Sequence, residues 1–266
     1  MERISSRQNS VVKRFRALVH AGSADEEILL DGPHLLDEAL GCGLAVNVAA
    51  FADSASANRL APLVARAEMA GVRTMAASDT LFQALSPVQH PSGVVSIARR
   101  PSVTIASALE RAPQLLLLLE GVQDPGNVGA IIRAAEACGA TGVLVGAGSA
   151  DPFGWKALRG AMGSSFRLPV MARVSLPDAL PTLRAAGVRI LASVPRSGRA
   201  PSELDLRSPA AIVLGAEGTG IPDDLADAAD ERLTIPMHAP VESLNVAIAA
   251  ALVLYEASRQ RADVAL

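Results

Sequence analysis

The chain has 266 residues, of which 50% are hydrophobic and 19% are charged, and its formal net charge is −3. Such a hydrophobic content excludes a disordered chain, and the longest purely aliphatic run, Leu115–Leu119, is far too short to cross a bilayer. Two cysteines, Cys42 and Cys138, cannot form a disulfide framework or a cysteine-rich zinc site. The first twenty residues lack the apolar core of a signal peptide, so we expect a cytoplasmic protein without membrane association.

The N-terminal part of the chain alternates between helical and strand-like patterns. Arg99-Arg100-Pro101 and the short segment after it are the best candidate for a boundary, so we expect a small α/β domain over residues 1–105. The predicted elements are a helix over 10–19, a strand over 27–30, a helix over 34–40, a strand over 46–51, helices over 58–70 and 78–85, and a strand over 93–98.

Residues 106–266 show a more regular alternation of strands and helices. This rhythm predicts a mostly parallel sheet covered on both faces, with ligands beyond the carboxyl ends of its strands. The predicted strands cover 115–120, 142–146, 188–194, 211–215 and 233–236, with an apolar stretch over 166–171. The predicted helices cover 128–138, 153–162, 177–186, 223–228 and 243–259.

The loop after the strand at 115–120 carries polar residues at the expected ligand edge. Asn127 is well placed as a helix N-cap. Arg133 and Glu136 are three residues apart on one helix face, which is compatible with a surface ion pair between them. The apolar neighbours of Arg133 equally favour a phosphate contact by its guanidinium, so both interpretations stay open.

Two further loops follow later strands. Gly215, Gly218 and Gly220 permit a close approach of the backbone to a ligand, and Glu217 either faces that ligand or caps the next helix. In the other loop, Ser243 is an ordinary N-cap, whereas Asn245 would lie inside the first apolar turn, where a buried amide needs partners.

Together the three loops resemble the motifs of the SpoU ribose methyltransferases, a family of the SPOUT class. The matching segments are Asn127-x-Gly129-x-x-x-Arg133-x-x-Glu136, Leu214-Gly215-x-Glu217-Gly218-x-Gly220, and Ile235-Pro236-Met237 with Ser243-Leu244-Asn245-Val246. The resemblance implies a SPOUT-type α/β knot, with a mostly parallel sheet and a deep trefoil knot, preceded by a smaller α/β domain. One departure is Ala239, followed by Pro240, where many family members carry glycine.

The resemblance also implies S-adenosylmethionine as cofactor and a ribose 2′-hydroxyl of RNA as acceptor. It assigns cofactor contacts to Leu214, Gly215, Gly218, Ile235, Met237 and Leu244. It places Asn127, Arg133, Glu217, Ser243 and Asn245 around the reacting ribose. No metal is required, because this cofactor carries its own electrophile. A guanidinium stays protonated, so we interpret Arg133 as a phosphate or oxyanion clamp and leave the general base unassigned.

A weaker resemblance covers the N-terminal domain. Ile4-Ser-Ser-Arg7-Gln8-Asn9 and Asp31-Gly32-Pro33-His34 are similar to the ribosomal-protein-like accessory domain of longer family members, which helps to bind RNA. This layout favours ribosomal over transfer RNA as substrate, and the family implies a homodimer through the C-terminal domain. Arg7, Lys13 and Arg14 are candidate RNA contacts, although a solvated helix face also accounts for them.

Two alternatives belong to other functional classes. A non-catalytic RNA-binding paralogue would have the same fold, but the polar motif residues are intact. A nucleotide-binding α/β oxidoreductase would also fit the alternating pattern, yet the chain lacks the dinucleotide fingerprint and its acidic partner. We therefore predict a methyltransferase with residues 1–105 as RNA-binding domain and residues 106–266 as catalytic domain.

Overall fold

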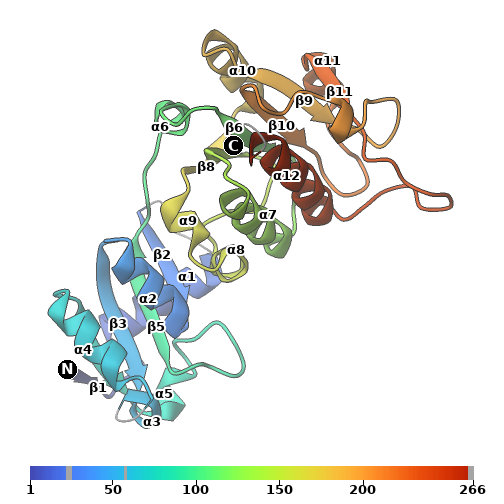
Figure 1. Cartoon of the computed structure of the whole chain (residues 1–266). Helices are drawn as coiled ribbons and strands as arrows, with labels where there is room; N and C mark the ends of the chain where they lie inside the picture. Colours follow the sequence, from blue (N-terminus) through green and yellow to red (C-terminus); the bar gives the residue numbers. More distant parts are fainter. Residues whose placement is uncertain (22–25, 57–58, 263–266) are drawn as a thin grey trace. The chain divides into compact units, whose positions relative to one another are not determined.

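The computed structural model describes residues 1–21, 26–56 and 59–262 (Figure 1). The chain forms two compact units, which we call unit 1 and unit 2. Unit 1 comprises Met1–Pro101 and Phe153–Phe166, and unit 2 comprises Ser102–Pro152 and Arg167–Leu266. The sequence patterns did not predict that the chain returns to unit 1 at Phe153.

Unit 1 is built on a five-stranded mixed sheet. Its strands are β1 (Glu2–Ile4), β2 (Glu27–Asp31), β3 (Val46–Ala52), β4 (Arg73–Ala77) and β5 (Val94–Arg99). The order is β1-β4-β3-β5-β2, in which β1, β4 and β3 are parallel and β5 is antiparallel to both β3 and β2. Two of these strands, β1 and β4, were not predicted.

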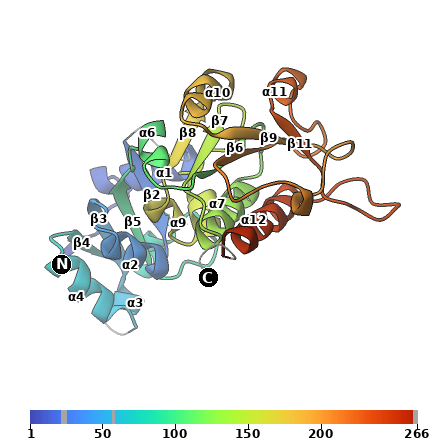
Figure 2. The ribbon, with the colours of Figure 1, turned by 45° about the horizontal axis from the view of Figure 1, so that its top comes forward.

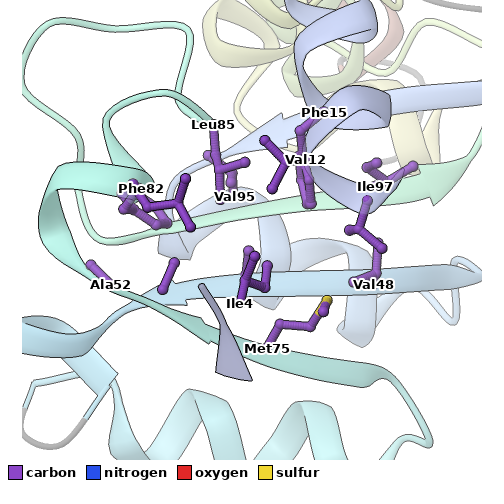
Figure 3. Close-up of a cluster of buried hydrophobic side chains, with 14 of the residues drawn as sticks. Ile4, Val12, Phe15, Val48, Ala52, Met75, Phe82, Leu85, Val95 and Ile97 are labelled. Atoms are coloured by element: carbon purple, nitrogen blue, oxygen red, sulfur yellow. The ribbon is translucent and has the colours of Figure 1, made fainter. Parts of the chain in front are cut away.

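Helices cover both faces of this sheet. They are α1 (Ser10–Ala21), α2 (Pro33–Gly41), α3 (Asp53–Ser56), α4 (Ala61–Met69), α5 (Asp79–Phe82) and α8 (Trp155–Ala161). On one face, the buried side chains of α1 and α5 pack on the strands, with Val12 and Phe15 standing over Val48 and Ile97 (Figure 3). On the other face, α2 and α4 bury a second apolar cluster around Phe51. The helix predicted over 58–70 is α4, and residue 58 lies outside the described residues.

Unit 2 contains a six-stranded sheet in which every strand pair is parallel, as the alternating pattern predicted. Its strands are β6 (Leu115–Leu119), β7 (Gly142–Gly146), β8 (Val170–Val174), β9 (Arg189–Ser193), β10 (Ala210–Leu214) and β11 (Glu231–Leu233). The order is β11-β9-β10-β6-β7-β8. All five leucines of β6 are fully buried, because this strand lies inside the sheet between β10 and β7 and is covered from both faces.

The faces of the unit 2 sheet are covered by two sets of helices. The helices and one 3₁₀ turn are α6 (Ile105–Leu109), α7 (Pro125–Ala137), α9 (Ser164–Arg167, which begins in unit 1), α10 (Leu176–Ala185), η1 (Pro201–Glu203), α11 (Asp223–Asp227) and α12 (Val246–Ala262). Helices α6, α10 and α11 share one apolar cluster with the strands. Helices α7 and α12 pack side by side, as both views show (Figures 1 and 2).

None of the helices in the described ranges has the length and apolar content needed to cross a membrane. Strand order and pairing establish the α/β architecture of unit 2, and the trefoil knot stays a prediction.

Candidate active site at the carboxyl edge of the parallel sheet

The polar loops of unit 2 gather at one edge of its sheet. Since all strands are parallel, the loops that follow β6, β9, β10 and β11 leave from the same edge. The chain runs outward from β6 to β7 and β8, and then places β9 and β10 on the other side of β6. The loops after β6 and β10 therefore flank the point at which the strand order reverses, where α/β sheets bind their ligands.

A chain of hydrogen bonds joins three residues that come from three different loops. The side-chain amide of Asn127 donates to Oε1 of Glu217. Nδ2 of Asn245 donates to Oδ1 of Asn127 over 3.1 Å. Oδ1 of Asn245 in turn accepts from the backbone N–H groups of Ala247 and Ile248, at 3.0 and 3.3 Å. The structure thus brings together three of the five residues expected around the ribose.

The helix caps differ from the sequence predictions. Helix α7 is capped by Asp124, whose carboxylate accepts from the N–H groups of Gly126 and Asn127 at 2.6 and 3.3 Å, so the prediction that Asn127 is the cap is wrong. Helix α12 begins at Val246 and is capped by Asn245, so Ser243 is not its cap and Asn245 is not inside the first turn. Because Asp124 performs the capping, the amide of Asn127 is left to bind Glu217 and Asn245.

The glycine loop after β10 is closed by its own backbone. Ala216 and Gly220 exchange two hydrogen bonds, of 3.1 and 3.0 Å, across the turn. Gly218 and Gly220 have φ angles of +100° and +73°, which side-chain-bearing residues rarely adopt. A Cβ on Gly215 would lie 2.2 Å from the carbonyl carbon of Gly220, so no other residue fits there without moving the loop.

A cavity of about 560 Å³ opens beside this loop. The six residues that the family resemblance assigns to the cofactor all line it, together with Glu217, Ser243 and Asn245. The last residue of β9, Ser193, and the loop that follows it as far as Arg196 also contribute to the wall, and sequence reasoning missed them. A signal was available, since a strand next to β10 in a parallel sheet must end at the same edge. The volume lies within the range of small-molecule and cofactor sites.

Arg133 lies on α7 outside this cavity lining. Its side chain is exposed and makes no hydrogen bond or ion pair with the described residues. Glu136 instead binds Arg167, with Nε to Oε1 at 2.6 Å and a second bond of 2.9 Å. The predicted alternative of an Arg133–Glu136 pair is therefore wrong, and the Arg133 guanidinium is available to a ligand.

A further carboxylate, which sequence reasoning did not single out, lies at the end of β6. Glu120 is partly buried and packs against Gly146, where a Cβ would lie 2.3 Å from Oε2. Burial, and to a lesser degree the nearby charge of Asp224, raise the pKa of Glu120. Its position directly after five buried leucines was the available signal, because a charge there marks the end of a buried strand.

The three candidate RNA contacts of the N-terminal domain have different surroundings in unit 1. Arg7 and Lys13 are exposed and unpaired among the described residues. Arg14 binds Glu27 through two nitrogens, one at 2.7 Å, and this contact raises the pKa of Arg14 and lowers that of Glu27. No group of three or more histidine, cysteine or acidic side chains in the described ranges is placed to hold a metal ion.

Known proteins are similar to this chain in sequence and in structure. The model of the SpoU rRNA Methylase family matches residues 114–255. The 23S rRNA (guanosine(2553)-2′-O)-methyltransferase RlmP of Bacillus subtilis is 31% identical, over 96% of this chain and 98% of the relative. An uncharacterized tRNA/rRNA methyltransferase of Synechocystis is 34% identical, over 97% of this chain and 94% of the relative.

Solved structures of methyltransferases are also similar to this chain. An rRNA methyltransferase from Sinorhizobium meliloti with bound AdoMet, which is S-adenosylmethionine, has a TM-score of 0.84 and 27% identity, and the match covers 97% of both chains. The SpoU methyltransferase AviRb from Streptomyces viridochromogenes, also in complex with AdoMet, has a TM-score of 0.82 and 28% identity, over 96% of this chain and 99% of the other. The resemblance noted in the sequence is confirmed: the chain belongs to the SpoU rRNA Methylase family.

Proposed function

We propose that this protein transfers a methyl group from S-adenosylmethionine to a ribose 2′-hydroxyl in ribosomal RNA. The observation that carries the proposal is the hydrogen-bonded set Glu217–Asn127–Asn245, which adjoins a cavity lined by all six expected cofactor contacts. The relative from Bacillus subtilis is named as a guanosine 2′-O-methyltransferase of 23S rRNA. A guanosine ribose in large-subunit RNA is therefore the first acceptor to test.

The cavity suits this cofactor by its volume and by the residues that line it. Leu214, Ile235, Met237 and Leu244 supply apolar walls for an aromatic base, and the glycine loop exposes backbone polar groups at close range. When bound, S-adenosylmethionine supplies an electrophilic methyl group on sulfur. The residues of this chain have to hold the acceptor oxygen in line with that methyl, and such positioning lowers the barrier by several kcal/mol (roughly 7–11 in the best oriented cases).

We assign the acceptor side to the residues that the three loops bring together. Asn127 and Asn245 fix each other and the Glu217 carboxylate, which leaves Oε2 of Glu217 open to accept from a ribose hydroxyl. Ser243 lines the same cavity with an exposed side chain. Arg133, which has no hydrogen-bond or ion-pair partner among the described residues, would clamp a phosphate or the developing oxyanion. A guanidinium group is in general a poor base, so we do not assign Arg133 as the general base.

We further propose that unit 1 holds the RNA and that two chains form a dimer through unit 2. Arg7 and Lys13 are free to contact phosphates, whereas Arg14 would first have to release Glu27. On α12, Ile248, Leu252 and Tyr255 are 54%, 46% and 66% exposed, and their spacing puts them on one stripe. A second copy would cover this stripe. We also propose a cytoplasmic location, where such an enzyme would meet its ribosomal RNA substrate.

The test uses tritiated S-adenosylmethionine and separate pools of unmodified ribosomal and transfer RNA. The proposal expects label in ribosomal RNA as an alkali-resistant dinucleotide, which is diagnostic of a 2′-O-methyl group. Label in transfer RNA alone would refute the substrate class while keeping the chemistry. Cofactor binding that persists without transfer to any RNA, including assembled ribosomal particles, would favour the non-catalytic RNA-binding alternative.

A further inference from the structure

Two charged side chains of unit 2 line the cofactor cavity without belonging to the acceptor-side set. Among the described residues of the cavity wall, only Arg196, Glu217 and Glu242 carry a formal charge. The Glu217 carboxylate is held by Asn127. Arg196 belongs to the loop after β9, and Glu242 lies shortly before the start of α12. The cavity wall therefore has one cation and one anion whose roles are still open.

Arg196 and Glu242 pair with each other, although they are 46 residues apart in the sequence. Nη2 of Arg196 lies 3.5 Å from Oε1 of Glu242, and the two side chains are 76% and 82% exposed. Neither side chain makes another hydrogen bond or ion pair with the described residues. An exposed pair of this kind is weak, because water and salt screen both charges. A ligand with suitable charges can therefore replace it at little cost.

The amino-acid end of S-adenosylmethionine carries a matching pair of charges. At neutral pH this end is a zwitterion, with a carboxylate and an ammonium group on the same carbon atom. A guanidinium can bind a carboxylate through two parallel hydrogen bonds, and a carboxylate accepts from an ammonium group. Most other residues of the cavity wall are apolar or glycine, for example Leu214, Ile235 and Met237. Such a wall suits the adenine base, whereas two charges need polar partners.

We propose that Arg196 binds the α-carboxylate of S-adenosylmethionine and that Glu242 binds its α-ammonium group. The proposal rests on the proposed function and names the residues that select a cofactor with an amino-acid end. The two side chains neutralise each other in the structure. Each of them would exchange its present partner for a ligand group of the same charge as that partner, so binding leaves neither side chain without an opposite charge.

Two ligands separate this contact from the rest of the cavity. S-adenosylhomocysteine has the amino-acid end, whereas 5′-methylthioadenosine has the same nucleoside and a thioether sulfur but no amino-acid end. Arg196→Met and Glu242→Gln each remove one charge from the cavity wall. Arg232→Met is the matched control, because it removes an exposed arginine of unit 2 that pairs with Asp227 at 2.9 Å and does not line the cavity.

Titration calorimetry measures the Kd of both ligands for each variant, and circular dichroism verifies that the variants are folded. The Kd of S-adenosylhomocysteine should rise about tenfold in R196M and about threefold in E242Q, since each variant loses a charge-assisted contact at an exposed place. The Kd of methylthioadenosine should stay within about twofold of wild type in both variants. R232M should bind both ligands as wild type does. Added salt should weaken the binding of S-adenosylhomocysteine to wild type more than that of methylthioadenosine.

Wild-type affinity of R196M for S-adenosylhomocysteine would overturn the proposal, and a raised KM for RNA in the same variant would then assign Arg196 to a phosphate of the RNA. An equal loss of both ligands would also overturn it, because the pair would then shape the cavity without binding the amino-acid end. If wild-type protein shows the expected ligand binding but methylates no RNA, the proposed function fails and this inference stands. If it binds neither ligand, both fail.

Discussion

Gly215 is the position at which the close approach of two loop segments leaves no room for a side chain. In Gly215→Ala, the new Cβ would lie 2.2 Å from the carbonyl carbon of Gly220 and 2.4 Å from the nitrogen of Ile221. An ordinary contact between two carbon atoms is about 3.5 Å, so the distance from the new Cβ to the carbonyl carbon of Gly220 is too short by roughly 1.3 Å. The atoms in the way are backbone, so the turn from Ala216 to Gly220 has to move. Overpacking of this kind costs about 1–3 kcal/mol.

We expect this cost to appear in cofactor binding, because the displaced turn lines the cavity. A penalty of about 1–3 kcal/mol weakens binding by about 5-fold to 150-fold. Titration calorimetry with S-adenosylmethionine measures the change, and circular dichroism verifies that the variant is folded. Gly148→Ala is the control, since its Cβ would meet Oε1 of Glu120 at an ordinary 3.5 Å. A folded G215A that binds the cofactor as tightly as wild type would refute the steric argument.

Three further predictions concern other parts of unit 2. Arg133→Ala should lower methyl transfer by about 100-fold or more while cofactor affinity stays nearly unchanged, and wild-type turnover in a radiolabel assay would exclude the clamp role. Since burial and Asp224 raise the pKa of Glu120, the folded state favours the protonated form of this carboxyl group. Its contribution to the free energy of unfolding is therefore lost as the pH rises through the pKa of the folded state. Glu120→Gln should therefore melt higher than wild type at neutral pH, with the difference vanishing below the ordinary glutamate pKa; parallel melting curves at all pH values would contradict this. Leu252→Glu should weaken a dimer by about 30-fold or more in sedimentation experiments, whereas Met69→Glu, on the exposed part of unit 1, should leave association unaltered.

The elements that sequence patterns predicted well are those whose burial is complete on both faces. The run of five leucines in β6 is an example, because its composition alone requires an interior position. Strand β1 shows the opposite case. It has three residues, of which only Ile4 is buried, so no periodicity exists to detect, and its pairing with β4 across about 70 residues decides its conformation.

The site residues were predictable as types, and their partners were not. Asp124 and Asn127 are both good helix caps, and local preference alone cannot choose between them. Pro125 favoured Asp124, because proline is common at the first helical position. The bond between Asn127 and Asn245 spans 118 residues and depends on how β6 and β11 share one edge. Arg167 as the partner of Glu136 likewise depends on tertiary packing.

Unit 1 consists of two segments that are separate in the sequence, Met1–Pro101 and Phe153–Phe166, and this has a consequence for folding during synthesis. A domain made of one continuous segment can fold as soon as its last residue leaves the ribosome. Unit 1 cannot complete its contacts at Pro101, because Trp155 and Arg159 are still to be made. At about 5–20 residues per second, the remaining stretch of about 65 residues takes roughly 3 to 13 s. During that interval the carboxylate of Asp31 lacks its ion-pair partner Arg159. The Asp31-Gly-Pro-His34 motif of a newly made chain is therefore without a contact that it has in the finished protein.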